Sequence, residues 1–369
     1  MRFRLVTWRW TIPTQSPVAR VSLWLWFTCF ATFVMIGKIT WAQDCAGCLA
    51  TASWEEPVPT GEWLLTKQVT EVNVLFVATS NGRPIGNLSQ NDILVEDDNK
   101  PPSAILQFRT EQALPLRVGL AIDTSNSVNS RFRFEQAAAN VFFHEVMDRD
   151  VDLGFVMGFE NHPYMSQDFV GDPDLLGKGV ERLTIGGGTA LYDAVLAACQ
   201  KLRDRPEKNM VARVLIVLSD GLNNASVASL GRAIAAAQEA EVTIYAISTN
   251  YTTASSESVS DTQVAFDVQY GNWNLRQLAE QTGGLVLHPR SPNDMTKAFE
   301  KIGQELRSRY SVSYKPADFT PDGHFRAIKI EAQTTGRKLR VRARKGYYAR
   351  AVSWLSPDSQ DPAHASSVR

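Results

Sequence analysis

The stretch RVGLAIDTSNS, residues 117–127, joins an apolar run to a group of polar side chains. The run has branched residues and no proline, a pattern typical of a strand that is covered on both faces. Asp123, Ser125 and Ser127 follow it, so one carboxylate and two hydroxyls lie where the predicted strand ends. In open α/β sheets this end of the strands borders the ligand crevice. Oxygen donors without thiolate or imidazole suit a hard cation such as Mg²⁺.

Two later stretches predict further donors at the same edge. The segment GGGT, residues 186–189, precedes a helical pattern, and we expect Thr189 to be the N-cap of that helix. The segment RVLIVLSDG, residues 213–221, predicts a second buried strand, and Asp220 follows the end of that strand. The alternative for the first stretch is that Asp-x-Ser only caps a turn.

The five residues Asp123, Ser125, Ser127, Thr189 and Asp220 resemble the metal-ion-dependent adhesion site of the von Willebrand factor A (VWFA) family. The segments GGTALYDA and VLIVLSDGLNN look like those of bacterial, acidobacterial-type VWFA-related proteins. The resemblance covers about residues 116–308, and none of the five positions departs from the pattern. It implies that the three hydroxyls ligate Mg²⁺ or Mn²⁺ directly and that the two aspartates act mostly through water. An open coordination position would then take a carboxylate from a protein partner.

Two further side chains stand near the predicted ligands. Asp193 lies one turn into the helix after Thr189, and Ser219 directly precedes Asp220. We expect both to hydrogen-bond to the ligands. The alternative is that Asp193 only supplies negative charge to the start of a helix and Ser219 only caps the end of a strand.

Residues 116–308 alternate between strand and helix patterns, which predicts a doubly wound, mostly parallel α/β sheet covered on both faces. A helical stripe after the first strand predicts burial of Phe134, Ala138, Val141 and Phe142. We expect Ser226 to cap a later helix around residues 230–237. The polar residues 249–272 are expected to form a long loop. Further strands are expected at residues 151–159, 242–248 and 285–288, with a short edge strand at residues 166–170.

Residues 71–110 and 309–350 have the alternation of β-strands and no helical pattern. Neither segment has enough strands to be stable alone. We expect them to pair as one sandwich-like module, with residues 116–308 inserted between its halves. The alternative is two separate units. Arg340, Arg342 and Arg344 alternate with apolar residues, and we interpret them as the solvated face of an edge strand rather than an anion-binding stripe.

The first 42 residues are expected to direct export. Four arginines precede the apolar run from Val21 to Gly37. No acidic residue lies before or within this run, as in a signal peptide. Cleavage before Gln43 and retention as an N-terminal anchor both fit. Either outcome predicts an extracytoplasmic protein, secreted or periplasmic, that meets a membrane only through this segment. Cys45 and Cys48 are then expected to form a disulfide. Residues 43–70 resemble a linker, and residues 351–369 a disordered tail.

The sequence favours binding over catalysis. A net charge of -1 gives no reason to expect nucleic acid as a partner. Phosphate-loop, zinc-protease and nucleophile-elbow motifs are absent from the sequence. A Mg²⁺-dependent phosphohydrolase would need an aspartate where Ser125 stands. We therefore expect a metal-dependent protein-binding (adhesion or interaction) module. The alternative is a structural envelope scaffold whose ion only stabilises the loops.

Overall fold

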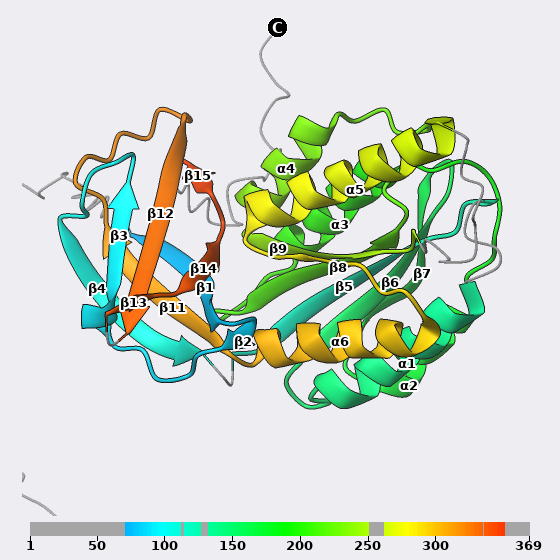
Figure 1. Ribbon diagram of the computed structural model, residues 1–369, viewed down its shortest axis with the longest axis horizontal. Helices are drawn as coiled ribbons and strands as arrows, with labels where there is room; N and C mark the ends of the chain where they lie inside the picture. The colour runs from blue at the N-terminus through cyan, green and yellow to red at the C-terminus, as the bar shows by residue number, and fades with distance from the viewer. Residues whose placement is uncertain (1–70, 112–113, 127–131, 251–261, 335, 351–369) are drawn as a thin grey trace, which may run out of the picture. The chain divides into compact units, whose positions relative to one another are not determined.

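The computed structural model describes residues 71–111, 114–126, 132–250, 262–334 and 336–350 (Figure 1). The predictions for residues 1–42, 43–70 and 351–369, for the Cys45–Cys48 disulfide and for Ser127 lie outside these ranges. Within the described ranges, no helix is both long enough and apolar enough to cross a membrane.

A six-stranded sheet forms the middle of the described chain, in the order β10-β9-β8-β5-β6-β7. Its neighbouring strands are parallel except for β6 and β7, which are antiparallel. Every residue of β5 is buried, because solvent reaches neither face of the sheet. The strands are β5 (Leu116–Asp123), β6 (Leu153–Phe159), β7 (Pro163–Val170), β8 (Ala212–Ser219), β9 (Val242–Ser248) and β10 (Val286–Leu287).

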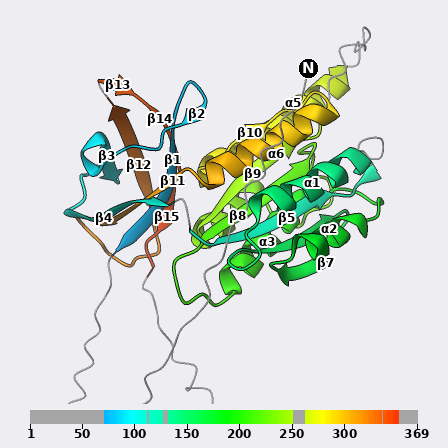
Figure 2. The same cartoon turned by 90° about the horizontal axis from the view of Figure 1, so that it is seen from below.

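Helices cover both faces of this sheet (Figures 1 and 2). On one face α1, α2 and α6 share a core that includes Phe142 and Phe299. On the other face α3, α4 and α5 share a second core that includes Cys199 and Leu275. The predicted doubly wound, mostly parallel α/β fold is therefore confirmed. The helices are α1 (Phe132–Val146), α2 (Pro173–Glu181), α3 (Leu191–Asp204), α4 (Leu230–Glu239), α5 (Thr262–Thr282) and α6 (Pro292–Leu306).

Two local expectations were wrong, and one helix was missed. Phe134 and Val141 of α1 are 51% and 40% exposed, whereas Phe143 is fully buried. The helix carries apolar residues on more than one side, so its period alone does not decide which side is covered. Residues 262–272, expected as loop, begin α5, and α2 was not expected at all. The first half of α5 lacks an apolar period because it is largely exposed.

The two β segments pair with each other on both sides of a shared core, as predicted. One sheet has the order β14-β1-β11-β4, with β2 paired to β1, and the other has the order β13-β12-β15, with β3 paired to β12. Phe76 of β1 and Ile330 of β12 belong to the same core. The strands are β1 (Val72–Ser80), β2 (Arg83–Pro84), β3 (Ile93–Asp97), β4 (Ala104–Glu111), β11 (Arg309–Lys315), β12 (Phe325–Thr334), β13 (Arg337–Lys338), β14 (Arg340–Ala343) and β15 (Gly346–Tyr348); a short 3-10 helix, η1 (Gln90–Asp92), precedes β3.

The arginines of β14 and its following turn do not share one solvated face. Arg340 is exposed, but Arg342 pairs with Glu305 of α6, and Arg344 pairs with Glu241 at 3.0 Å. Only 11% of the Arg344 side chain is exposed. The expectation of a solvated stripe was therefore wrong for these two residues. Their acidic partners lie in distant parts of the sequence, so no local pattern indicates them.

Candidate metal site

Two neighbouring strands deliver the aspartates to one edge of the sheet. Strands β5 and β8 are parallel, with Ile122 opposite Leu218, so their carboxyl ends lie side by side. Asp123 ends β5, and Asp220 follows β8. The Ser125 N–H donates to Oδ1 of Asp123 at 2.9 Å, and the Ser219 hydroxyl donates to Oδ2 at 2.6 Å. Both oxygens of Asp123 are thus oriented by hydrogen bonds, and Ser219 makes the contact that was predicted for it.

The GGGT segment is tied to the loops that follow three strands. Gly186 N–H donates to the Thr124 carbonyl after β5 at 2.8 Å. Gly188 N–H donates to Oδ1 of Asn161, which lies after β6, at 2.9 Å. Thr189 N–H donates to Oδ1 of Asn224, after β8, at 2.8 Å. These bonds bring Thr189 to the edge of the sheet where Asp123 and Asp220 lie.

Thr189 had been expected to be the N-cap of α3, and this expectation was wrong. The N-cap is Ala190, which offers no side-chain acceptor. The Ser226 hydroxyl, from the loop after β8, instead accepts from the N–H groups of Tyr192 and Asp193 at 3.0 and 3.2 Å. Ser226 therefore caps α3, whereas Ser229 caps α4 and the expectation for Ser226 was wrong. Because Ser226 accepts from the first N–H groups of α3, the Thr189 side chain is not needed to cap this helix.

Asp193 holds the loop after β8 rather than a candidate ligand. Its carboxylate accepts from the N–H groups of Val227 and Ala228 at 2.9 and 2.8 Å. Together with the Ser226 cap, this makes a reciprocal contact between the start of α3 and that loop. The expected hydrogen bond to a ligand is not among the contacts of this side chain in the described residues.

The four described candidate ligands are buried: Asp123 is 0% exposed, Ser125 2%, Thr189 3% and Asp220 4%. Burial raises the pKa of Asp123 to about 6, although hydrogen bonds from Ser125 and Ser219 oppose the shift. The negative charge of Asp220 raises this pKa further. A cation bound beside Asp123 would stabilise the charged form of this carboxylate.

The donor set is one of carboxylates and hydroxyls. Among the described residues, no group of three or more His, Cys, Asp and Glu side chains could hold a metal ion. Carboxylate and hydroxyl oxygens are donors that suit a divalent cation such as Mg²⁺ or Mn²⁺. Ser127, the fifth predicted ligand, lies outside the described residues.

Sequence reasoning did not identify the asparagines that hold this edge together. Asn161 and Asn224 anchor the GGGT segment, and Asn250 Nδ2 donates to the Asp220 carbonyl at 2.7 Å. Each follows a strand by two to five residues, namely β6, β8 or β9. That position was the available signal, since parallel strands end at the same edge.

Residues 118–223 match the von Willebrand factor type A domain family. No relative was found among the curated proteins. The chain is 14% identical to a von Willebrand factor type A protein from Catenulispora acidiphila, over 78% of this chain and 75% of that one, with a TM-score of 0.43. It is 17% identical to an aerotolerance-related membrane protein from Bacteroides fragilis, over 52% and 98%, with a TM-score of 0.40.

The chain is also similar to proximal thread matrix protein 1 from the mussel byssus, whose metal-ion-dependent adhesion site is occupied by zinc. The identity is 16% over 57% of this chain and 50% of that one, so the match spans half of the mussel protein, and the TM-score is 0.43. The family match, together with the doubly wound sheet, places a von Willebrand factor type A domain over residues 118–223.

Proposed function

We propose that this chain is an exported, metal-dependent protein-binding module. Asp123, Ser125, Ser127, Thr189 and Asp220 would hold Mg²⁺ or Mn²⁺ at the carboxyl edge of the sheet. The observation that carries the proposal is the meeting of two buried aspartates with Ser125 and Thr189 at that edge. When bound, the ion would supply an electrophilic position for a carboxylate oxygen of a protein partner.

The residues of this chain have separate tasks in the proposal. Ser219 and the Ser125 N–H hold the Asp123 carboxylate in one orientation. Asn161 and Asn224 hold the segment that carries Thr189. Hydroxyl ligands leave more charge on a bound cation than carboxylate ligands do, so a partner carboxylate is the group that this site favours. The site has no proposed catalytic role.

Binding is favoured over a purely structural role for the ion. The loops at the site are already joined by direct hydrogen bonds, including the pair between Thr189 and Asn224 and the contacts of Asp193 with the loop after β8. An ion is not needed to close them. Limited proteolysis in Mg²⁺ and in EDTA is expected to give the same cleavage around residues 186–189 and 221–229. New cleavage there in EDTA would favour the scaffold alternative.

An extracytoplasmic location is part of the proposal, and the basic and apolar N-terminal sequence supports it. N-terminal sequencing of the mature protein tests this location. A start at Gln43 in a secreted or periplasmic fraction, or an intact Met1 in the membrane fraction, agrees with export. An intact Met1 in the cytosol contradicts it.

Calorimetric titration with Mg²⁺ tests the site itself. The wild-type chain is expected to bind the ion, and Asp123→Asn and Thr189→Ala are expected to abolish binding. Thr243→Ala is the matched control, because this threonine lies in β9, near the start of the strand and away from the ligand edge. Thermal unfolding of each variant verifies that the fold persists. Absence of Mg²⁺ and Mn²⁺ binding by the wild type would contradict the proposal.

A further inference from the structure

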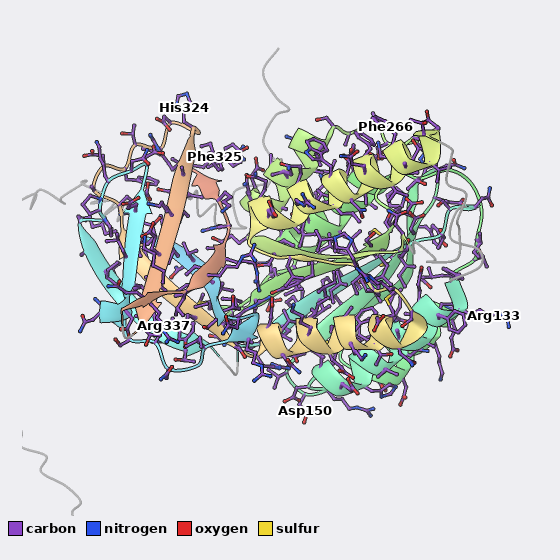
Figure 3. All side chains as sticks on the ribbon, in the orientation of Figure 1. Arg133, Asp150, Phe266, His324, Phe325 and Arg337 are labelled. Carbon is purple, nitrogen blue, oxygen red and sulfur yellow. The ribbon has the colours of Figure 1, made fainter. Side chains whose placement is uncertain are left out.

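Helix α5 carries an exposed row of aromatic side chains. Phe266, Tyr270 and Trp273, which we name the aromatic stripe, are 59%, 42% and 47% exposed. Their spacing of four and three residues places them on one side of the helix. The rings run nearly parallel, with centroids 6.2 Å apart in both pairs. Figure 3 shows Phe266 on the side of α5 away from the sheet. Large exposed apolar surfaces of this kind mark interaction sites.

The aromatic stripe is held against the candidate metal site. Gly271, between Tyr270 and its neighbour along the stripe, packs so tightly that a side chain there would collide with the Asp220 carbonyl oxygen. One turn further on, Asn274 Nδ2 donates to the Gly221 carbonyl at 2.9 Å. The middle of α5 is thus fastened to the segment that carries one candidate ligand. Only glycine permits this close approach.

A second contact joins the stripe to the Thr189 segment. Tyr192 lies in the first turn of α3, and burial, with a smaller contribution from the nearby Tyr270 side chain, raises its pKa, so the two side chains are neighbours. The stripe is therefore anchored to the chain segments after both Asp220 and Thr189. The packing of α5 against these segments fixes the position of the stripe relative to the candidate metal site.

The segment of α5 that carries the stripe has few charged residues. Between Thr262 and Leu275, Asp267 is the one charged residue. Val227 is 95% exposed, in the loop that Asp193 holds at the start of α3. A surface with this composition complements apolar side chains, since aromatic residues with few charges are typical of the centre of protein interfaces. The exposed Arg276 lies one turn after Trp273, so the helix carries one acidic residue within the stripe and one basic residue at its end.

We propose that the aromatic stripe binds apolar side chains of the same protein segment whose carboxylate enters the metal site. The inference rests on the proposed function and names its partner more closely: an acidic residue with apolar neighbours in the same chain segment. The ion would bind the carboxylate of the acidic residue, and the stripe would bind the apolar side chains next to that residue. Aromatic side chains at the centre of such contacts carry a large part of the binding free energy.

Selection from a library of short random peptides tests this. The library is passed over the immobilised full chain in Mg²⁺, and bound peptides are eluted with EDTA. The eluted peptides are expected to share an Asp or Glu with apolar residues beside it. A synthetic peptide of the selected sequence is expected to bind Phe266→Ala and Trp273→Ala about tenfold more weakly than wild type. Trp273→Phe, which keeps a ring, should retain most of the affinity.

The control variant is Phe325→Ala. Phe325 of β12 is 40% exposed and packs against Tyr348 with ring centroids 5.4 Å apart, so it matches the stripe residues in exposure and ring contact. Figure 3 shows Phe266 and Phe325 on α5 and β12. This variant is expected to bind the peptide as wild type does. All variants are expected to bind Mg²⁺ equally in calorimetric titration.

The outcomes separate the two proposals. Loss of Mg²⁺ binding by the wild type contradicts the proposed function itself. Mg²⁺ binding without any enriched peptide overturns the inference on the stripe but leaves the metal site. Peptides that lack apolar neighbours, or that bind the stripe variants as tightly as wild type, overturn it too. So does binding of the stripe to glycans on an array in the absence of Mg²⁺.

Discussion

The Ser219 hydroxyl donates to Oδ2 of Asp123 at 2.6 Å and accepts from the Gly221 N–H at 3.0 Å. Because the Gly221 N–H occupies a lone pair of the Ser219 hydroxyl, the single proton of that hydroxyl is directed to the carboxylate. One side chain thus connects the ends of β5 and β8 at the candidate metal site.

Ser219→Ala is expected to weaken Mg²⁺ binding roughly tenfold, which corresponds to loss of about 1.5 kcal/mol from a hydrogen bond to a charged group. The Asp123 carboxylate loses a donor that orients it and favours its charged form. Calorimetric titration at neutral pH measures the change. Ser248→Ala is the matched control, since Ser248 stands opposite Ser219 at the end of β9 but bonds to Asn272. Equal affinities of the two variants would contradict the role of Ser219.

Ser226→Ala is expected to lower the free energy of unfolding by about 1 kcal/mol, because two N–H groups of α3 lose their acceptor. Ser229→Ala, which removes the local cap of α4, is expected to cost a similar amount. Only the first variant should also weaken Mg²⁺ binding, because the loop of Ser226 contains the Asn224 that holds Thr189. Urea unfolding and calorimetric titration measure the two effects. If both variants affect Mg²⁺ binding alike, the connection through this loop is wrong.

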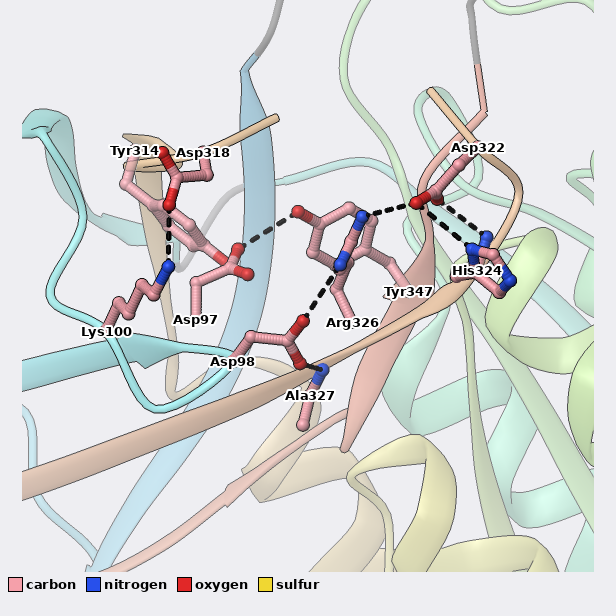
Figure 4. A network of polar contacts seen from close by, with 10 residues as sticks. All are labelled: Asp97, Asp98, Lys100, Tyr314, Asp318, Asp322, His324, Arg326, Ala327 and Tyr347. Carbon is pink, nitrogen blue, oxygen red and sulfur yellow. Dashed lines mark hydrogen bonds and ion pairs between the residues drawn. The ribbon is translucent and has the colours of Figure 1, made fainter. Parts of the chain in front are cut away.

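Asp97 in the β module is expected to make stability depend on pH. Its Oδ2 accepts from the hydroxyls of Tyr314 and Tyr347 at 2.8 and 3.0 Å (Figure 4). Burial raises the pKa of Asp97, and these two hydrogen bonds only partly oppose the shift. A raised folded-state pKa means that stability from Asp97 is fully present below the pKa of the unfolded chain. It is lost as the pH rises through the folded-state pKa.

Urea unfolding of wild type and Asp97→Asn across the acidic range measures this loss. Asparagine does not titrate and keeps an oxygen acceptor for the tyrosines, so the difference between the two proteins isolates the carboxyl group. The stability of wild type relative to the variant is expected to fall as the pH rises from acid to neutral. A constant or rising difference would show that the pKa of Asp97 is not raised by burial.

Removal of residues 309–369 is expected to destabilise the N-terminal strands. Strand β11 lies between β1 and β4, which do not pair with each other, and β12 is the partner of β3. The shortened chain should therefore aggregate or be cleaved within residues 71–111. A chain ending at residue 350 is the control and should unfold cooperatively. Limited proteolysis that leaves residues 71–111 equally protected in both chains would contradict the shared module.

Local pattern predicted the parallel sheet and the site aspartates because burial imposes a simple rule on the sequence. A strand covered on both faces is apolar along most of its length, as Val118–Ile122 is, so polar residues directly after it mark its end. The position of Asp123 and Asp220 at one edge then follows from parallel strands. The pairing of the two β segments followed in the same way, since each has an apolar face that needs cover.

Contacts between distant segments could not be predicted from pattern. Ser226 caps α3 because the loop after β8 meets the start of that helix, and no spacing in the sequence encodes that meeting. The exposure of Phe134 depends on which side of α1 meets α2 and α6. Arg342 is paired because β14 brings it to Glu305 of α6.

The sequence by itself determined the fold class, the strands that end at the candidate site and the need of the two β segments for each other. Each of these depends on which faces of an element are buried, and the period of apolar residues indicates those faces. The tertiary structure alone decided that Asn161 and Asn224 hold the segment that carries Thr189 and that Asn274 holds α5 to Gly221. Such hydrogen bonds depend on directions and distances between elements, which packing sets and periodicity does not record.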